Sequence, residues 1–395
     1  MRHMTVVFSM ACLILSPLCF AQEHPIVTPV RATRVNKPVI CPPKPLVQMA
    51  ILLDTSGSMS GLIDQARGEL WSIVNEFISS QRDGVTPEIH VALFEYGKSS
   101  LPQASGYIRS IVPFTTDLDT LSEELFALHT NGGDEYCGWV IKEAVEGLKW
   151  SDNSRDLKVI FIAGNEPFTQ GPVDYKISNK AAIKKGIIVN TIHCGSEAAG
   201  LEGQWKQGAL IADGQYLNIN QNQKIVYIPA PQDDQIALLS QQLNSTYIPF
   251  ERQGTERQTA QAAQDHNAKR LSVTSSLQRA VAKASSNYSN SHWDLVDAIK
   301  RKGLDPNTLK PNDLPEVMKT MSPKQRFVYI DQKARKRANI QVQIKKLNEQ
   351  RNAYVAQVKK SQPSQKTLGS AITLAIRDQA IKSGLTFVDP KTKTK

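Results

Sequence analysis

The strongest chemical signal in the sequence is the segment Asp54–Ser58, in which one carboxylate and two hydroxyls, those of Asp54, Ser56 and Ser58, alternate along a short turn. The segment directly follows the apolar run 47–53, VQMAILL, which is typical of a strand buried on both faces. Ligands of open α/β sheets bind outside the carboxyl ends of the strands, and Mg²⁺ prefers oxygen ligands. The segment therefore predicts a divalent-cation site, with Mg²⁺ expected first and Mn²⁺ or Ca²⁺ as alternatives. A plainer interpretation is that a serine only caps the next helix.

Strand and helix patterns alternate through the first 250 residues. Apolar runs of strand length are separated by segments whose apolar residues recur at helical spacing. Repeated strand–helix units predict an α/β fold with a Rossmann-like, doubly wound and mostly parallel sheet, followed by a smaller α-helical region. The expected strands cover 47–53, 89–94, 107–112, 157–163, 187–193 and 215–219, and the expected helices cover 61–79, 121–128, 136–148, 179–185 and 204–212.

The sequence LLDTSGSMSG after a hydrophobic strand resembles the metal-ion-dependent adhesion site of von Willebrand factor A (VWA) domains. The resemblance extends over residues 46–250 and is to a bacterial exported branch with a helical extension after the domain. It implies a Rossmann-like domain in which three loops hold a metal ion. It also implies that a carboxylate of the bound partner often completes the coordination of the metal.

The second and third loops of this chain depart from the family pattern. In the second loop, residues 130–135, Asp134 stands where the family usually has a threonine, which implies that Asp134 binds the metal directly or through water. The alternative is that an acid here only complements the positive end of the following helix. The third loop places Gly164 where many relatives have an aspartate. Additional ligands, or residues that support the ligands, are expected among Thr130, Glu135, Asn165 and Glu166.

The first 45 residues are expected to lie outside the folded domain. Residues 1–21 combine a short positive region, an apolar run of about 10 residues and a small residue at the cut, which is typical of a secretory signal peptide. The run is too short to cross a bilayer, and the rest of the chain holds no transmembrane segment. Residues 22–45 contain six prolines and predict an extended leader. We therefore expect export to the periplasm or the cell envelope.

Three cysteines remain beyond the signal peptide. Cys137 and Cys194 are both predicted near the carboxyl edge of the sheet, so a disulfide between them is expected in an oxidising compartment. Cys41 is the alternative partner for either one. His193 precedes Cys194, but neighbouring residues of a strand point to opposite faces, which argues against a catalytic Cys–His pair.

Residues 251–395 are expected to form a basic helical region. They contain 28 Lys and Arg against 12 Asp and Glu, a net charge of +16, whereas the first 250 residues carry −6. Helices are predicted around 295–299, 314–318, 340–358 and 368–381. Aromatic residues are sparse among the basic ones, so we expect no nucleic-acid partner. The basic residues fit a solvated helix face, or a surface that faces anionic envelope components.

These features favour a binding protein over an enzyme. The expected function is docking of a protein partner in the periplasm or envelope through the divalent cation, with no catalytic residue assigned. One alternative is a metal-dependent hydrolase that uses Glu135 or Glu166 as a base. Another is a structural envelope factor in which the metal only stabilises the fold.

Overall fold

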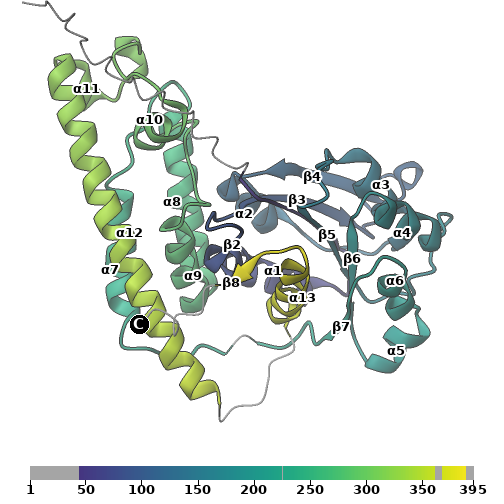
Figure 1. Ribbon diagram of the computed structural model, residues 1–395. Coiled ribbons are helices and arrows are strands. Elements are labelled where there is room, and N and C mark those ends of the chain that lie inside the picture. The colour runs from purple at the N-terminus through teal and green to yellow at the C-terminus, as the bar shows by residue number, and fades with distance from the viewer. Residues whose placement is uncertain (1–43, 225, 361–366, 388–395) are drawn as a thin grey trace, which may run out of the picture. The chain divides into compact units, whose positions relative to one another are not determined.

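A six-stranded sheet with helices on both faces forms the framework of the protein (Figure 1). The computed structural model describes residues 44–224, 226–360 and 367–387. The strand order is β4-β3-β1-β5-β6-β7, and every neighbouring pair is parallel except β3 and β4. This arrangement confirms the predicted doubly wound, mostly parallel sheet. Its strands are β1 (Leu46–Asp54), β3 (Glu88–Tyr96), β4 (Ile108–Thr115), β5 (Leu157–Gly164), β6 (Ile188–Cys194) and β7 (Tyr216–Ile219).

The central strand β1 is apolar throughout because both of its faces are covered. Val47 and Met49 belong to the core on one face of the sheet, whereas Ala50 and Leu52 belong to the core on the other. This alternation is the period of two that a strand imposes on its side chains. It also places Asp54, at the end of β1, on the same side as Leu52.

Helices from distant parts of the chain cover each face of the sheet. The face that contains Val47 is covered chiefly by α1 (Ser60–Glu76), α2 (Leu118–Ala127), α7 (Asp233–Asn244), α9 (Val273–Lys283) and α13 (Leu368–Lys382). The opposite face is covered by α3 (Cys137–Gly147), α4 (Tyr175–Lys184) and α6 (Trp205–Ile211), with the short α5 (Glu197–Glu202) beside α6.

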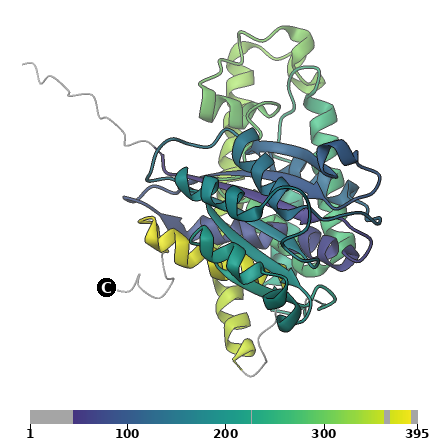
Figure 2. The same ribbon diagram turned by 90° about the vertical axis from the view of Figure 1, so that its right-hand side faces the viewer.

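The last described helix, α13, packs on the sheet rather than on the other late helices. It contacts α1, β5, β6 and β7, and the two views show it beside these elements (Figures 1 and 2). Its first turn is held by Glu69 of α1, whose carboxylate accepts hydrogen bonds from the Gly369 N–H at 2.6 Å and the Thr367 hydroxyl at 2.7 Å. The strand β8 (Thr386–Phe387) then pairs with β2 (Ser80–Gln81). Part of the predicted helical region 251–395 thus completes the cover of the sheet.

The long helix α12 (Pro323–Lys359) includes the predicted helical stretch 340–358 and extends it towards the N-terminus. It begins with a capping box between Ser322 and Gln325. Two arginines lie on its buried face, and both are paired. Arg351 binds Asp233 at 2.6 Å, and Arg337 binds Asp294 at 2.6 Å. Arg351, which interrupts the apolar face in the sequence, is therefore an anchor to α7.

The other late helices form a small core of their own with α12. The residues Ile248, Leu295, Met318 and Ile330 are buried together there. The helices that contribute are α10 (Leu295–Lys302) and α11 (Glu316–Lys319), with the 3₁₀ turn η3 (Pro311–Asp313) between them. Helix α8 (Gly254–Leu271) packs instead on α9 and α2. Two further 3₁₀ turns of the described residues are η1 (Phe77–Ser79) and η2 (Gln103–Ser105).

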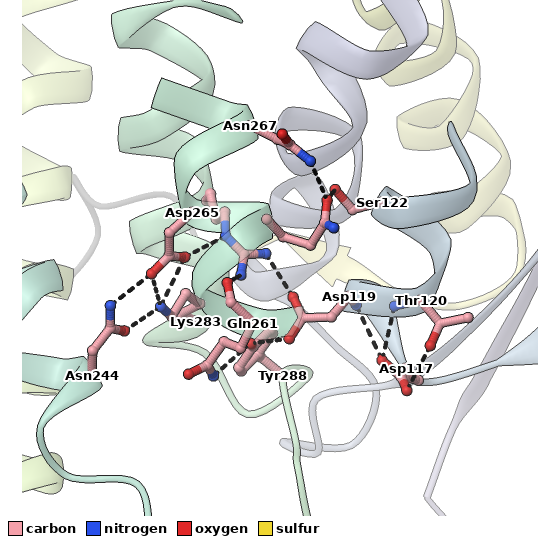
Figure 3. A network of polar contacts seen from close by, with 12 residues as sticks. Asp117, Asp119, Thr120, Ser122, Asn244, Gln261, Asp265, Asn267, Lys283 and Tyr288 are labelled. Atoms are coloured by element: carbon pink, nitrogen blue, oxygen red, sulfur yellow. Dashed lines mark hydrogen bonds and ion pairs between the residues drawn. The ribbon is translucent and has the colours of Figure 1, made fainter. Parts of the chain in front are cut away.

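A buried polar network joins α2 of the sheet domain to α8 and α9 (Figure 3). Arg279 donates to Asp119 at 2.7 Å and to Asp265 at 2.5 Å. Lys283 binds Asp265 at 2.8 Å, and the Tyr288 hydroxyl donates to Asp119 at 2.5 Å. Burial alone would raise the pKa of Asp265, but the charges of Lys283 and Arg279 lower it to about 2. The charges of this network compensate one another, so the helices after residue 250 are fixed to the sheet domain by directional contacts.

Candidate metal centre

Asp54 supplies a buried carboxylate at the carboxyl end of the central strand. Its Oδ1 accepts the main-chain N–H of Ser56 at 2.7 Å. Its Oδ2 is buried and has no hydrogen-bond partner among the described residues. The Asn165 N–H favours the charged form of Asp54 without reaching hydrogen-bond geometry with Oδ2. Burial is the main reason that the pKa of Asp54 is raised to about 7.

The hydroxyls of Ser56 and Ser58 lie next to this carboxylate in the first loop. Their Oγ atoms are 3.4 Å apart, and the Ser58 hydroxyl donates to Asn165 Oδ1 at 3.4 Å. Helix α1 takes Met59 as its N-cap, with no side-chain hydrogen bond. Neither serine therefore caps α1, which removes the plainer interpretation of the motif and leaves both hydroxyls available to a ligand.

In the second loop, the structure brings Glu135 rather than Asp134 to Asp54. A Cβ atom added to Gly97 would lie 2.7 Å from Glu135 Cγ and 2.9 Å from Asp54 Oδ1, so both acids border the same glycine. Burial, followed by the negative charges of Asp54 and Glu166, raises the pKa of Glu135 to about 8. Asp134 is exposed and accepts a hydrogen bond from the Tyr136 hydroxyl at 3.3 Å.

The remaining predicted residue of the second loop is Thr130, which is half-buried. The loop is joined to the first loop through the Asn131 N–H, which donates to the Thr55 carbonyl at 3.1 Å. Helix α3 takes Tyr136 as its N-cap without a side-chain hydrogen bond, and its first turn contains no acid. Neither Asp134 nor Glu135 therefore caps α3 with its side chain, although both directly precede the positive end of this helix.

The third loop has no space for the acid that the family usually places there. A Cβ atom on Gly164 would lie 2.5 Å from the Tyr96 hydroxyl and 3.0 Å from Asp54 Oδ2. Tyr96 donates to the Ala163 carbonyl at 3.0 Å, which fixes its hydroxyl in this position. Tyr96 is a residue that sequence reasoning missed, because it ends the neighbouring strand β3 and belongs to none of the three loops.

Two polar residues follow Gly164 and are half-buried. The Asn165 amide donates to Glu166 Oε1 at 3.4 Å, and the charge of Glu166 raises the pKa of both Asp54 and Glu135. His193, at the end of the neighbouring strand β6, contacts the third loop through its Nε2, which is 3.2 Å from the Asn165 carbonyl. Sequence reasoning considered His193 only as a partner of Cys194.

His193 has both ring nitrogens engaged. Nε2 donates to the Asn165 carbonyl, and Nδ1, at 3.1 Å from Asn218 Nδ2, accepts from that amide. This arrangement requires the neutral ring, and burial lowers the pKa of His193 in agreement with it. His193 therefore positions the third loop and is not free to act as a base.

The disulfide predicted between Cys137 and Cys194 is not formed. Both residues are free thiols, and burial raises the pKa of each. Cys137 packs in the core that contains Leu52, whereas Cys194 packs in the core on the opposite face. The prediction took into account that both residues lie near the carboxyl edge of the sheet. It did not take into account that they lie on opposite faces of it. The alternative partner, Cys41, lies outside the described residues.

The donor set fits a cation only if hydroxyls are included. Among the described residues there is no group of three or more His, Cys, Asp or Glu placed to hold a metal ion. The unpartnered Oδ2 of Asp54 is nevertheless an oxygen that a cation would satisfy, and two serine hydroxyls lie beside it. A hard cation such as Mg²⁺ accepts oxygen donors of this kind and keeps several waters. Asp54, Ser56 and Ser58 fit this requirement, and Glu135 is the neighbouring acid.

Comparisons with known proteins give matches among solved structures only. No protein-family model and no curated protein matches the chain. The conserved hypothetical protein BatB from Bacteroides thetaiotaomicron is 17% identical, covers 44% of this chain and 90% of its own length, and has a TM-score of 0.34. The SpRpn10 VWA domain is 17% identical over 45% of this chain and 90% of its own length, with a TM-score of 0.35.

A third similar structure is an aerotolerance-related membrane protein from Bacteroides fragilis NCTC 9343. It is 15% identical, covers 45% of this chain and 93% of its own length, and has a TM-score of 0.30. Within the described part of the present chain, no helix is long and apolar enough to cross a membrane. The strand order and the loop Asp54–Ser58 at the carboxyl end of β1 are those that the sequence resemblance to VWA domains implies, so the sheet topology of the chain is VWA-like.

Proposed function

We propose that this protein binds a divalent cation at Asp54, Ser56 and Ser58 and uses the site to dock a protein partner. The observation that carries the proposal is the buried, unpartnered Oδ2 of Asp54 beside two hydroxyls that cap no helix. A bound cation, with Mg²⁺ expected first and Mn²⁺ or Ca²⁺ as alternatives, would supply positive charge that orients an oxygen donor of the partner. Glu135 is the second acid of the site in this proposal, and Asp134 is an exposed residue at its rim.

We propose a binding role rather than an enzymatic one. The histidine and the two cysteines at this edge are already engaged or buried, so only the acids Glu135 and Glu166 remain as bases for the hydrolase alternative. His193 has both nitrogens in hydrogen bonds, and the thiols of Cys137 and Cys194 are buried with raised pKa values. A metal-dependent hydrolase would need a free general base beside an open metal position.

We place the docking event in the periplasm or cell envelope, on the strength of the signal-peptide pattern in residues 1–21. That segment and the leader as far as residue 43 lie outside the described residues. Expression of the full chain with its own N-terminus, followed by fractionation and sequencing of the mature N-terminus, tests this part. Recovery of the uncut chain from the cytoplasm would contradict it.

Partner capture with matched variants tests the docking role. The full chain is compared with Asp54→Ala and with the control Asp134→Asn, each with Mg²⁺ and with EDTA, against an envelope extract. A partner band that requires Mg²⁺, is lost in Asp54→Ala and persists in Asp134→Asn supports docking through the cation. A band that survives EDTA and Asp54→Ala contradicts it. Loss of thermal stability in Asp54→Ala with Mg²⁺ but no change in capture would instead favour the structural role.

A further inference from the structure

The long helix α12 carries a strongly basic surface that the candidate metal centre does not use. The helix contains ten Lys and Arg residues against two Asp and Glu residues. Only two of the ten, Arg337 and Arg351, are buried, and both pair with acids of other elements. The Arg335 side chain, by contrast, is 81% exposed, and its pairing with Asp331 lies at the surface. Helix α12 therefore presents an excess of positive charge to solvent.

Helix α12 packs on the rest of the protein through one face. Its contacts are chiefly with α7, α9 and α10, and the buried apolar residues of this face are Ile330, Ile340 and Ile344. Figure 1 shows α12 at the outer edge of the helical part, on the side away from the sheet. The opposite face of α12 is therefore open to a partner that is not part of the described chain.

Apolar side chains lie among the basic ones on this open face. Successive positions four or seven residues apart fall along one line of an α-helix. Five exposed residues follow this spacing and are called the outer stripe: Lys324, Val328, Arg335, Val342 and Lys346. Phe327 and Lys345, also exposed, flank the stripe. Phe327 is 68% exposed and Val342 is 67% exposed, so the described part of the chain leaves both apolar side chains uncovered.

We propose that the outer stripe of α12 binds the surface of a lipid bilayer that contains anionic headgroups. Lys and Arg side chains are attracted to such a surface, and apolar side chains among them enter the boundary between headgroups and acyl chains. A helix of 37 residues is about 55 Å long, so a line of side chains along it fits an extended, flat surface. A bilayer meets all three features, because it offers negative charge, an apolar interior and a flat surface.

This binding is separate from the proposed cation site. Helix α12 contributes none of the residues Asp54, Ser56 and Ser58, which belong to the end of β1 and the loop after it. The bilayer contact therefore goes beyond the proposed docking function, and it can be measured in EDTA, where no divalent cation is available. In EDTA, Asp54→Ala should bind vesicles as the wild type does.

Co-sedimentation of the full chain with vesicles in EDTA tests the proposal. Vesicles of equal parts phosphatidylglycerol and phosphatidylcholine are compared with vesicles of phosphatidylcholine alone. The wild type should bind the anionic vesicles and not the neutral ones, and added salt should weaken the binding. Each basic residue near an anionic surface strengthens binding about fivefold, so a triple variant that carries Arg335→Gln, Lys345→Gln and Lys346→Gln should bind about a hundredfold more weakly.

A matched triple variant controls for net charge alone. Lys180→Gln, Lys184→Gln and Lys206→Gln remove the same charge from exposed positions on α4 and α6. This control should bind anionic vesicles within about twofold of the wild type, because charges far from the contact are screened. A separate variant with Phe327→Gln and Val342→Gln keeps every charge and should bind about tenfold more weakly, because it removes the apolar side chains that enter the bilayer.

Three outcomes would overturn the proposal. The first is a wild type that binds neither kind of vesicle, or both equally. The second is a control triple variant that loses as much binding as the triple variant of α12, since net charge and not the outer stripe would then decide the binding. The third is unchanged binding in the variant with Phe327→Gln and Val342→Gln, which would assign the open face to an acidic polymer rather than to a bilayer. None of these outcomes bears on cation binding, so the two proposals can fail separately.

Discussion

Replacing Asp54 with asparagine should stabilise the cation-free protein at neutral and alkaline pH while it abolishes cation binding. The buried carboxylate has a folded-state pKa of about 7, against an ordinary value of 3.8. Asparagine has nearly the same shape and keeps an oxygen that can accept the Ser56 N–H, but it carries no charge. The variant therefore removes the cost of holding an ionised group in a buried position.

The sign of the pH dependence follows from the raised pKa. Between pH 3.8 and about 7 the folded state binds a proton at Asp54 that the unfolded state has lost, so stability falls as pH rises through this window. The loss is fully present above about pH 7. A shift of about 3 pKa units corresponds to about 4 kcal/mol as an upper value, and relaxation of the loop reduces the expected gain in Asp54→Asn to about 2–4 kcal/mol.

Urea unfolding of the full chain in EDTA at pH 5 and pH 8 measures this effect. The wild type should lose stability between the two pH values through both Asp54 and Glu135, whose pKa values are raised. Asp54→Asn should lose less, because only Glu135 still contributes, and the free energies of unfolding of the two proteins should converge towards pH 4. Asp134→Asn is the control, since its carboxylate is exposed, and its stability should follow that of the wild type within about 0.5 kcal/mol. Destabilisation of Asp54→Asn in EDTA at pH 8 would refute the conclusion that Asp54 is an uncompensated buried charge.

Three further predictions concern residues that position the site and the helices around it. Gly164→Ala should lower the free energy of unfolding in urea by about 1–3 kcal/mol, because its Cβ would collide with the Tyr96 hydroxyl. Adding Tyr96→Phe to the same chain should recover part of this loss. Equal losses with and without Tyr96→Phe would contradict the prediction. Arg279→Met should lower the free energy of unfolding in urea by about 3–5 kcal/mol, because it leaves the Asp119 carboxylate without its buried cationic partner. A double variant that also carries Asp119→Leu should be more stable than Arg279→Met alone, and a less stable double variant would contradict this. Glu69→Ala should increase hydrogen exchange in α13 more than in β1, and uniform exchange across the chain would speak against a specific cap.

The sequence was sufficient to predict the sheet because the buried strands are nearly uniform apolar runs. The expected strand 157–163 is observed as β5, Leu157–Gly164, and the expected strand 187–193 as β6, Ile188–Cys194. Helix bounds were less accurate where polar residues begin a helix, as in α4, which starts at Tyr175 rather than at residue 179. Asp174 caps this helix through its side chain, and the apolar spacing does not report that cap.

Contacts between elements distant in sequence could not be predicted. Nothing in the pattern of 368–381 indicates that this helix returns to the sheet, because an amphipathic face does not identify the surface that it covers. The paired arginines of α12 are a second case. Arg337 lies in a basic run that is typical of a solvated helix face, and Arg351 interrupts an apolar face, yet both are buried and paired with acids from other elements.

At the candidate metal centre, the local motif could be predicted but the neighbouring acid could not be assigned. Asp134 and Glu135 are adjacent, and only the backbone of the second loop decides which of them faces Asp54. The replacement of the third-loop acid by the Tyr96 hydroxyl depends on packing between β3 and β5 across β1, which spacing along the chain does not contain.

Isothermal titration calorimetry of the full chain with Mg²⁺ and with Mn²⁺ tests the central claim most directly. We predict saturable binding of one cation per chain at pH 8, loss of that binding in Asp54→Ala, and binding within about twofold of the wild type in Asp134→Asn. The absence of saturable binding of either cation to the wild type, or unchanged binding in Asp54→Ala, would contradict the assignment of Asp54, Ser56 and Ser58 as the metal centre.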